Sequence, residues 1–270
     1  MNIKTIKTNP WRMDNKALRH QAYLLYRPYR WRLCLMAIAR MAAISWLSLL
    51  LQTVTGMTNS VEISLLNLLI SLVTAPLEIG WFKQTLGLWS KTEPGWSSLF
   101  SFYGSRGKAV AAIACSLAQT LPLQAWGFIV LLIGNDDSVG LSASNDPVLV
   151  ILAILLLLVA IAAIWVELRF CLAGFQMAQE DSLDVRALLK GSFRTMHGRV
   201  WRLIGFSVAT GWWLMLAQFI ALIVVGKYVN APVFKLLGKI LVSALACIIQ
   251  PYVFVSMAGY ALKILHNKDE

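Results

Sequence analysis

The sequence predicts an all-helical, polytopic membrane protein with six transmembrane helices. Of its 270 residues, 58% are hydrophobic and only 14% are charged, and the mean hydropathy is +0.66. A soluble domain of this length needs far less apolar surface than that. The apolar runs are continuous rather than alternating, which favours helices over a barrel.

Six apolar runs are each long enough to cross a hydrocarbon layer of about 30 Å at about 1.5 Å per residue. They are residues 33–54, 61–82, 109–133, 148–175, 200–225 and 233–262. We expect consecutive runs to pair as hairpins within a single membrane domain, 1–270. Its predicted parts are a basic amphipathic N-terminal segment (1–32), hairpin 1 (33–86), an interfacial segment with hairpin 2 (87–178), an interfacial helix with hairpin 3 (179–264) and a polar tail (265–270).

Lysine and arginine are distributed unequally between the two sides that these runs define. Twenty lie on the side of the two termini, whereas only Lys227, Lys235 and Lys239 lie on the other. Basic segments remain in the cytoplasm, so we expect a multi-pass protein of the bacterial cell membrane with both termini cytoplasmic. The net charge of +11 then indicates attraction to anionic lipids. No recognition motif for nucleic acid accompanies it, so we expect no nucleic-acid partner.

The segment "LDVRALLKGSFRTMHGRVWRL", residues 183–203, places five cations between two apolar runs. A helix from Ser182 to His197 would align four apolar residues on one face: Val185, Leu189, Phe193 and Met196. Such a helix can lie in the interface, with this face toward the acyl chains and its cations on lipid phosphates. The expected headgroup-binding residues, with two from the N-terminal segment, are Arg186, Lys190, Arg194, Arg199, Arg202, Arg30 and Arg32. The alternative is that these cations only enforce topology.

Two other segments have a similar composition. In the N-terminal segment four residues are predicted to share an apolar face, with Pro28 as a break: Leu18, Ala22, Leu25 and Tyr29. Between the second and third runs, an aromatic segment precedes Arg106 and Lys108; it contains Trp96, Leu99, Phe100 and Phe102.

The sequence also contains matches at long, constant spacing. Gly107-Lys108 superposes on Gly198-Arg199 at an offset of 91, and Trp31-Arg32-Leu33 recurs as Trp201-Arg202-Leu203. We therefore predict three repeats, each an amphipathic segment followed by a helical hairpin. Chance matching among apolar residues is the alternative.

Two blocks of the chain resemble a known family. "DNKALRHQAYLLYRPYRWRL" and "LDVRALLKGSFRTMHGRVWRLIGFSVATGWWL" are similar to the two recurring blocks of the bacterial integral-membrane family called domain of unknown function 975. Lys190-Gly191, Trp201-Arg202-Leu203 and Trp212-Trp213 match the second block, whereas the family's P-G-x-x motif near its fourth span has no clear counterpart. The resemblance implies a multi-pass membrane protein, and it brings no catalytic residue or substrate.

Motifs for catalysis and metal binding are weak or missing. Gly104-Ser105-Arg106-Gly107-Lys108 lacks the hydroxyl residue and the preceding strand of a phosphate-binding loop. His20, His197 and His266 lack the spacing of metal ligands. We expect no enzymatic activity, no catalytic residue, no metal and no cofactor.

A few polar side chains fall within the apolar runs: Arg40, Glu78, Gln119, Gln218 and Gln250. Such groups are costly in lipid and mark functional sites or interhelical hydrogen bonds. Arg40 and Glu78 lie about 13 Å and about 8 Å along the first two runs from the cytoplasmic end. We predict that they pair; the alternative is that Arg40 extends alone to the phosphates.

Two functions fit these features. The first is a non-enzymatic scaffold or accessory subunit whose amphipathic helices bind anionic headgroups, a membrane protein partner or a second copy of the chain. The second is a small transporter or export component with a path between the hairpins. A transporter is expected to have a polar cavity reached by Gln119, Gln218 or Gln250, and a scaffold a filled, apolar interior.

Overall fold

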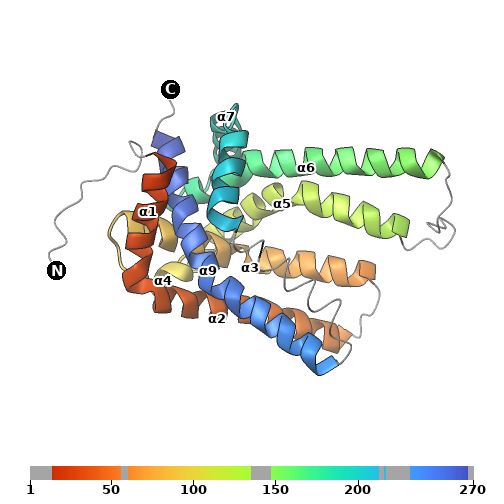
Figure 1. The fold of residues 1–270 in the computed structure, drawn as a ribbon, viewed down its shortest axis with the longest axis horizontal. Helices are drawn as coiled ribbons and strands as arrows, with labels where there is room; N and C mark the ends of the chain where they lie inside the picture. The colour runs from red at the N-terminus through yellow and green to blue at the C-terminus, as the bar shows by residue number, and fades with distance from the viewer. Residues whose placement is uncertain (1–13, 56–59, 135–146, 213–215, 217–231, 267–270) are drawn as a thin grey trace. The chain divides into compact units, whose positions relative to one another are not determined.

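The computed structural model describes residues 14–55, 60–134, 147–212, 216 and 232–266, in which all regular structure is helical. The predicted all-helical class is confirmed over these residues (Figure 1). A further helical stretch covers 200–212. The other helices are α1 (Asn15–Tyr26), the 3-10 turn η2 (Arg27–Tyr29), α2 (Arg30–Thr55), α3 (Ser60–Trp89), α4 (Trp96–Leu99), α5 (Arg106–Gly134), α6 (Pro147–Glu180), α7 (Val185–Thr195) and α9 (Pro232–His266).

Four helices in the described part of the chain are long and apolar enough to cross a membrane. They cover Asn15–Thr55, Val61–Trp89, Arg106–Val130 and Ile154–Glu180, and they correspond to the first four predicted runs. The fifth run, 200–225, extends outside the described residues, and α9, at the sixth run, is not among the four. The count of six therefore stays a prediction.

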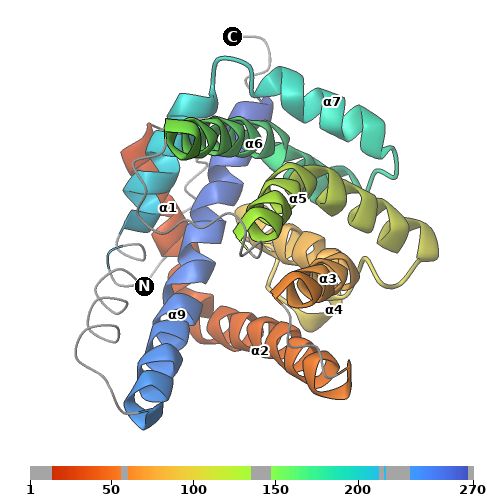
Figure 2. The same ribbon diagram turned by 90° about the vertical axis from the view of Figure 1, so that its right-hand side faces the viewer.

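The helices group into two compact units. The first unit comprises Met1–Ala42, Gly80–Leu99 and Trp201–Glu270, and within it α1 packs along α9 (Figure 1). The second comprises Ala43–Ile79 and Phe100–Val200. Within the second unit α5 and α6 lie side by side, as Figure 2 shows, and α7 packs on α6.

The N-terminal helix differs from the predicted pattern in the residues that it buries. Its buried residues are Leu18, Ala22 and Tyr26, whereas two residues predicted for this face are only half-buried, namely Leu25 and Tyr29. Pro28 breaks the α-helix as predicted, because α1 ends at Tyr26 and Pro28 lies in η2 before α2 begins. A 3-10 turn tolerates proline near its start, where the missing backbone N–H costs no helical hydrogen bond.

Pro76 interrupts the hydrogen-bond ladder of α3, because proline has no amide donor. The hydroxyl of Tyr103 donates to the carbonyl oxygen of Val73 at 2.8 Å, within one turn of the proline. The pKa of Tyr103 is raised, first by burial and second by the charge of Glu78. A side chain from outside the helix thus satisfies backbone near the proline, as is common for prolines in membrane helices.

Two glycines of the first unit allow very close packing. A Cβ at Gly80 would overlap the carbonyl oxygen of Leu99, and a Cβ at Gly259 would overlap the indole ring of Trp89. The Trp89 indole is oriented by a hydrogen bond from Nε1 to the carbonyl oxygen of Val255, at 2.8 Å. Small residues at such contacts let helices approach closely where packing, rather than water, drives association.

Candidate functional site

The amphipathic helix α7 is bounded by local signals on both sides. Asp184 caps its first turn, since Oδ1 accepts a hydrogen bond from the amide of Ala187 at 3.0 Å. Beyond its end, Gly198 adopts a left-handed conformation with φ of 73°. The predicted helix, Ser182–His197, is therefore corrected to Val185–Thr195, because its first residues form the cap and its last residues form the exit turn.

One face of α7 packs against α6. Leu188, Ser192 and Met196 are buried, and Ser192 Oγ donates to the carbonyl oxygen of Arg169 at 2.7 Å. Gly191 faces the side-chain amide of Gln176. The prediction that Met196 belongs to the lipid-facing row is wrong, because the helix has two adjacent apolar rows and the protein core takes the one that includes Met196.

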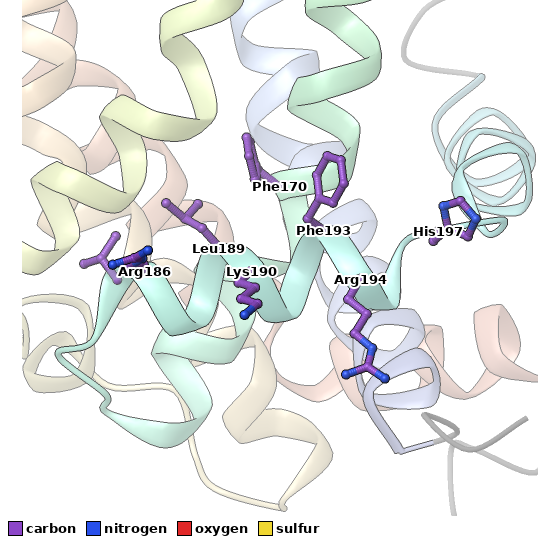
Figure 3. A pocket seen from close by; sticks show the side chains of 8 residues that line it. Phe170, Arg186, Leu189, Lys190, Phe193, Arg194 and His197 are labelled. Atoms are coloured by element: carbon purple, nitrogen blue, oxygen red, sulfur yellow. The ribbon is translucent and has the colours of Figure 1, made fainter.

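The other apolar row of α7 borders an open groove of about 1140 Å³ with α6. Figure 3 shows Leu189 and Phe193 on the side of Phe170, with Lys190 and Arg194 pointing the opposite way. The rings of Phe170 and Phe193 are in contact, with their centroids 5.8 Å apart. The groove is lined by Phe170, Val185, Arg186, Leu189, Lys190, Phe193, Arg194 and His197.

The charged side chains that line this groove are all basic. Arg186, Lys190 and Arg194 are exposed along it, as the sequence predicted, and its lining residues include no carboxylate. Among the described residues, the groove therefore combines an apolar floor with a cationic edge, and that combination suits an amphipathic anion.

The other predicted headgroup ligands have different surroundings. Arg202 is exposed and Arg199 is half-buried. The guanidinium of Arg30 lies 5.4 Å from the centroid of the Trp31 ring. Arg32 pairs with Glu93 at 3.9 Å, in an ion pair whose side chains are 48% and 74% exposed. Such an exposed pair is weak, so Arg32 can exchange this partner for a phosphate at little cost.

The sequence of α6 locates the groove relative to a membrane. Large apolar side chains are exposed along α6 from Ile151 to Ile164. Trp165 and Arg169 follow, and Phe170 lies six residues past Ile164, or about 9 Å along the helix. An exposed apolar stretch followed by tryptophan and arginine is typical of a span that leaves the hydrocarbon. The groove thus lies about 9 Å along α6 beyond this exposed apolar stretch, within the candidate span Ile154–Glu180.

The structure describes two of the three predicted intramembrane amides. Gln119 Nε2 donates to the carbonyl oxygen of Phe170 at 2.7 Å, which is an interhelical hydrogen bond. Gln250 is half-buried in α9. Gln218 lies outside the described residues.

Arg40 is a buried cation of the first unit, with 3% of its surface exposed. Its guanidinium carbon lies 5.3 Å from the centroid of the Trp81 ring and 5.7 Å from that of Phe254. Aromatic faces stabilise a desolvated cation. Glu78 is half-buried in α3, and its pairing with Arg40 stays a prediction.

The sequence analysis missed two residues at one end of the groove. The sequence analysis proposed neither Arg169 nor His197 as a site residue. The structure places Arg169 Nη2 3.5 Å from His197 Nδ1. The available signal was an arginine within an apolar run, one turn after Trp165, which by itself indicated a functional position.

The described residues define an all-helical protein with four helices long and apolar enough to cross a membrane and a basic amphipathic helix, α7, packed on one of them. Comparisons with family models, curated proteins and solved structures return no match. The resemblance to domain of unknown function 975 rests on the quoted motifs alone, and membership of that family stays a prediction.

Proposed function

We propose that this chain is a non-enzymatic, multi-pass membrane protein that binds anionic lipid headgroups through α7 and serves as a scaffold or accessory subunit. The observation that carries the proposal is the groove, which combines an apolar floor, a cationic edge and a position past the apolar stretch of α6. An interfacial helix binds by burying its apolar face and placing its cations near lipid phosphates. The alternative occupant of this surface is a partner protein or a second copy of the chain.

The hydrogen bonding of the second unit supports this function over a transporter. Gln119 bonds to the Phe170 carbonyl, and Tyr103 bonds to backbone beside Pro76. Two groups that a polar path would use are thus engaged within the protein. Side-chain donors to helical carbonyls commonly join membrane helices without forming a path.

Charge reversal of α7 tests the proposal. The variant Arg186→Glu, Lys190→Glu, Arg194→Glu should weaken binding of the reconstituted protein to vesicles rich in anionic phospholipid. Each cation near the surface contributes about 1 kcal/mol, so the loss of three lowers affinity by about 100-fold or more. Co-sedimentation of the detergent-solubilised protein with such vesicles measures this change.

A matched variant separates the helix from net charge. Lys16, Arg27 and Lys91 are exposed cations outside α7, and their replacement by glutamate changes the net charge equally. This control should lose much less binding. Equal losses in both variants would mean that only overall charge matters, and undiminished binding in the α7 variant would refute the function.

For the topology, we propose six spans with both termini in the cytoplasm of a bacterial cell. The unequal distribution of lysine and arginine supports this orientation. A reporter that is active only outside the cytoplasm should be active when fused at residue 140 and inactive when fused at residue 270. The reverse pattern would overturn the proposed orientation.

We also propose that the chain contains internal repeats, and the exposure pattern of two helices supports this. Trp31 and Trp201, the matched tryptophans, are 68% and 72% exposed. Buried positions then recur two, five and nine residues later: Leu33, Met36 and Arg40 in one helix, and Leu203, Phe206 and Thr210 in the other. Equal spacing of buried positions is what two copies of one helix would retain.

A further inference from the structure

Arg169 has hydrogen-bonding capacity that its neighbours leave unused. Its guanidinium carbon lies 4.5 Å from the centroid of the Phe193 ring and 5.7 Å from that of Trp165. Nε is buried and has no acceptor within the described residues. A guanidinium has five N–H donors and no acceptor, and the ring contacts do not give Nε an oxygen.

The second basic group at this point is His197, whose Nδ1 lies 3.5 Å from Arg169 Nη2. Glu167, the nearest carboxylate along α6, is two residues from Arg169, and side chains at that spacing do not face each other on a helix. Arg194 also lines the groove, but its side chain points away from Phe170 (Figure 3) and does not join Arg169 and His197. Basic groups gathered without a facing carboxylate are typical of an anion site, and arginine matches phosphate in particular.

An apolar surface continues directly from these groups. The Phe193 ring that contacts Arg169 also contacts Phe170, and the groove then extends along Leu189 and Val185. A volume of about 1140 Å³ is at the upper end of the range for small-molecule sites, and it is ample for part of an acyl chain. The charge and the shape therefore suit a molecule with a phosphate at one end and a hydrocarbon chain beside it.

We infer that the groove binds one glycerophospholipid molecule, with its phosphate on Arg169 and His197 and an acyl chain on Phe170 and Phe193. This inference rests on the proposed function, since it requires the groove to lie at the headgroup level. It adds a defined, stoichiometric site to the diffuse attraction of the α7 cations. Arg169 recognises the phosphate, and the two phenylalanines recognise the chain.

The test uses the full chain purified in a mild detergent, stripped of lipid and titrated with dioleoyl phosphatidylglycerol under native mass spectrometry. We expect one tightly bound lipid per chain. Arg169→Gln should weaken this binding by at least about tenfold, since it removes charge-assisted hydrogen bonds. Phe193→Ala should also weaken it, whereas Lys16→Gln, at an exposed cation outside α7 and the groove, should leave it unchanged.

A second measurement does not depend on the folding of a variant. A phosphatidylglycerol with a photoreactive group in its acyl chain should label the unaltered protein in the peptides that contain Phe170 and Phe193. Labelling elsewhere only, or the absence of a one-to-one complex, would overturn the inference. Displacement of the lipid by millimolar inorganic phosphate, with no effect of Phe193→Ala, would also overturn it in favour of a phosphate site.

Failure of this inference can be told apart from failure of the proposed function. If vesicle binding depends on Arg186, Lys190 and Arg194 but no one-to-one lipid complex forms, the proposed function is supported and the lipid site is refuted. If a one-to-one lipid complex forms but vesicle binding does not depend on these three cations, the lipid site is supported and the proposed function is refuted.

Discussion

Replacing Gly80 by alanine is expected to destabilise the first unit by about 3 kcal/mol or more, at the upper end of the cost of overpacking. The new Cβ would overlap the carbonyl oxygen of Leu99. A backbone atom cannot rotate away as the end of a side chain can, so either α3 or α4 must move. The apparent melting temperature of the full chain in detergent measures the loss.

Gly205→Ala is the matched control for this substitution. Gly205 is in the helical stretch 200–212 of the same unit, and a Cβ there meets nothing within 4 Å. Alanine favours a helix over glycine by up to about 1 kcal/mol, so this variant should melt at the same temperature or slightly higher. Similar losses in both variants would contradict the close contact between Gly80 and Leu99.

Replacing Glu78 by glutamine is expected to lower the stability of the protein, by less than the ~3–5 kcal/mol of a fully buried ion pair because Glu78 is only half-buried. The reason is the predicted pairing with Arg40, which is only 3% exposed. Without that counter-charge, a guanidinium at this depth keeps its desolvation cost, which its contacts with Trp81 and Phe254 offset in part. Thermal unfolding in detergent measures the change.

A double-mutant cycle separates pairing from simple loss of a side chain. Adding Arg40→Met to Glu78→Gln should restore much of the stability, because the unpaired charge is removed with its partner. Glu62→Gln, at an exposed position in the first turn of the same helix, is the control and should have no effect. Strictly additive losses from Arg40 and Glu78 would rule the pair out.

Local properties of the chain predicted its helical class and the positions of its long helices. The run predicted at 61–82 lies within α3, and the run at 148–175 lies within α6. A continuous apolar stretch is visible in the sequence, and in lipid its backbone groups must bond within the segment. The cationic row of α7 could also be predicted from local spacing, since Arg186, Lys190 and Arg194 recur at helical spacing.

The faces of the amphipathic helices were not predictable to the same degree. Leu188 and Leu189 are neighbours in sequence, yet Leu188 is buried on the protein side whereas Leu189 lines the groove. Both belong to apolar rows at helical spacing, so periodicity alone does not choose between them. The choice depends on Gly191 and Ser192, which let α7 approach Gln176 and the Arg169 carbonyl of α6.

The sequence alone therefore determined that this chain is helical, apolar enough for a membrane and basic overall, because each of these properties follows from composition and local spacing. Only the tertiary structure brought Arg169 to His197 and Phe170 to Phe193, across 28 and 23 residues of chain. That juxtaposition depends on how the turn after α6 directs α7 back across its end. A turn's direction is set by packing between helices, and no local pattern of residues encodes it.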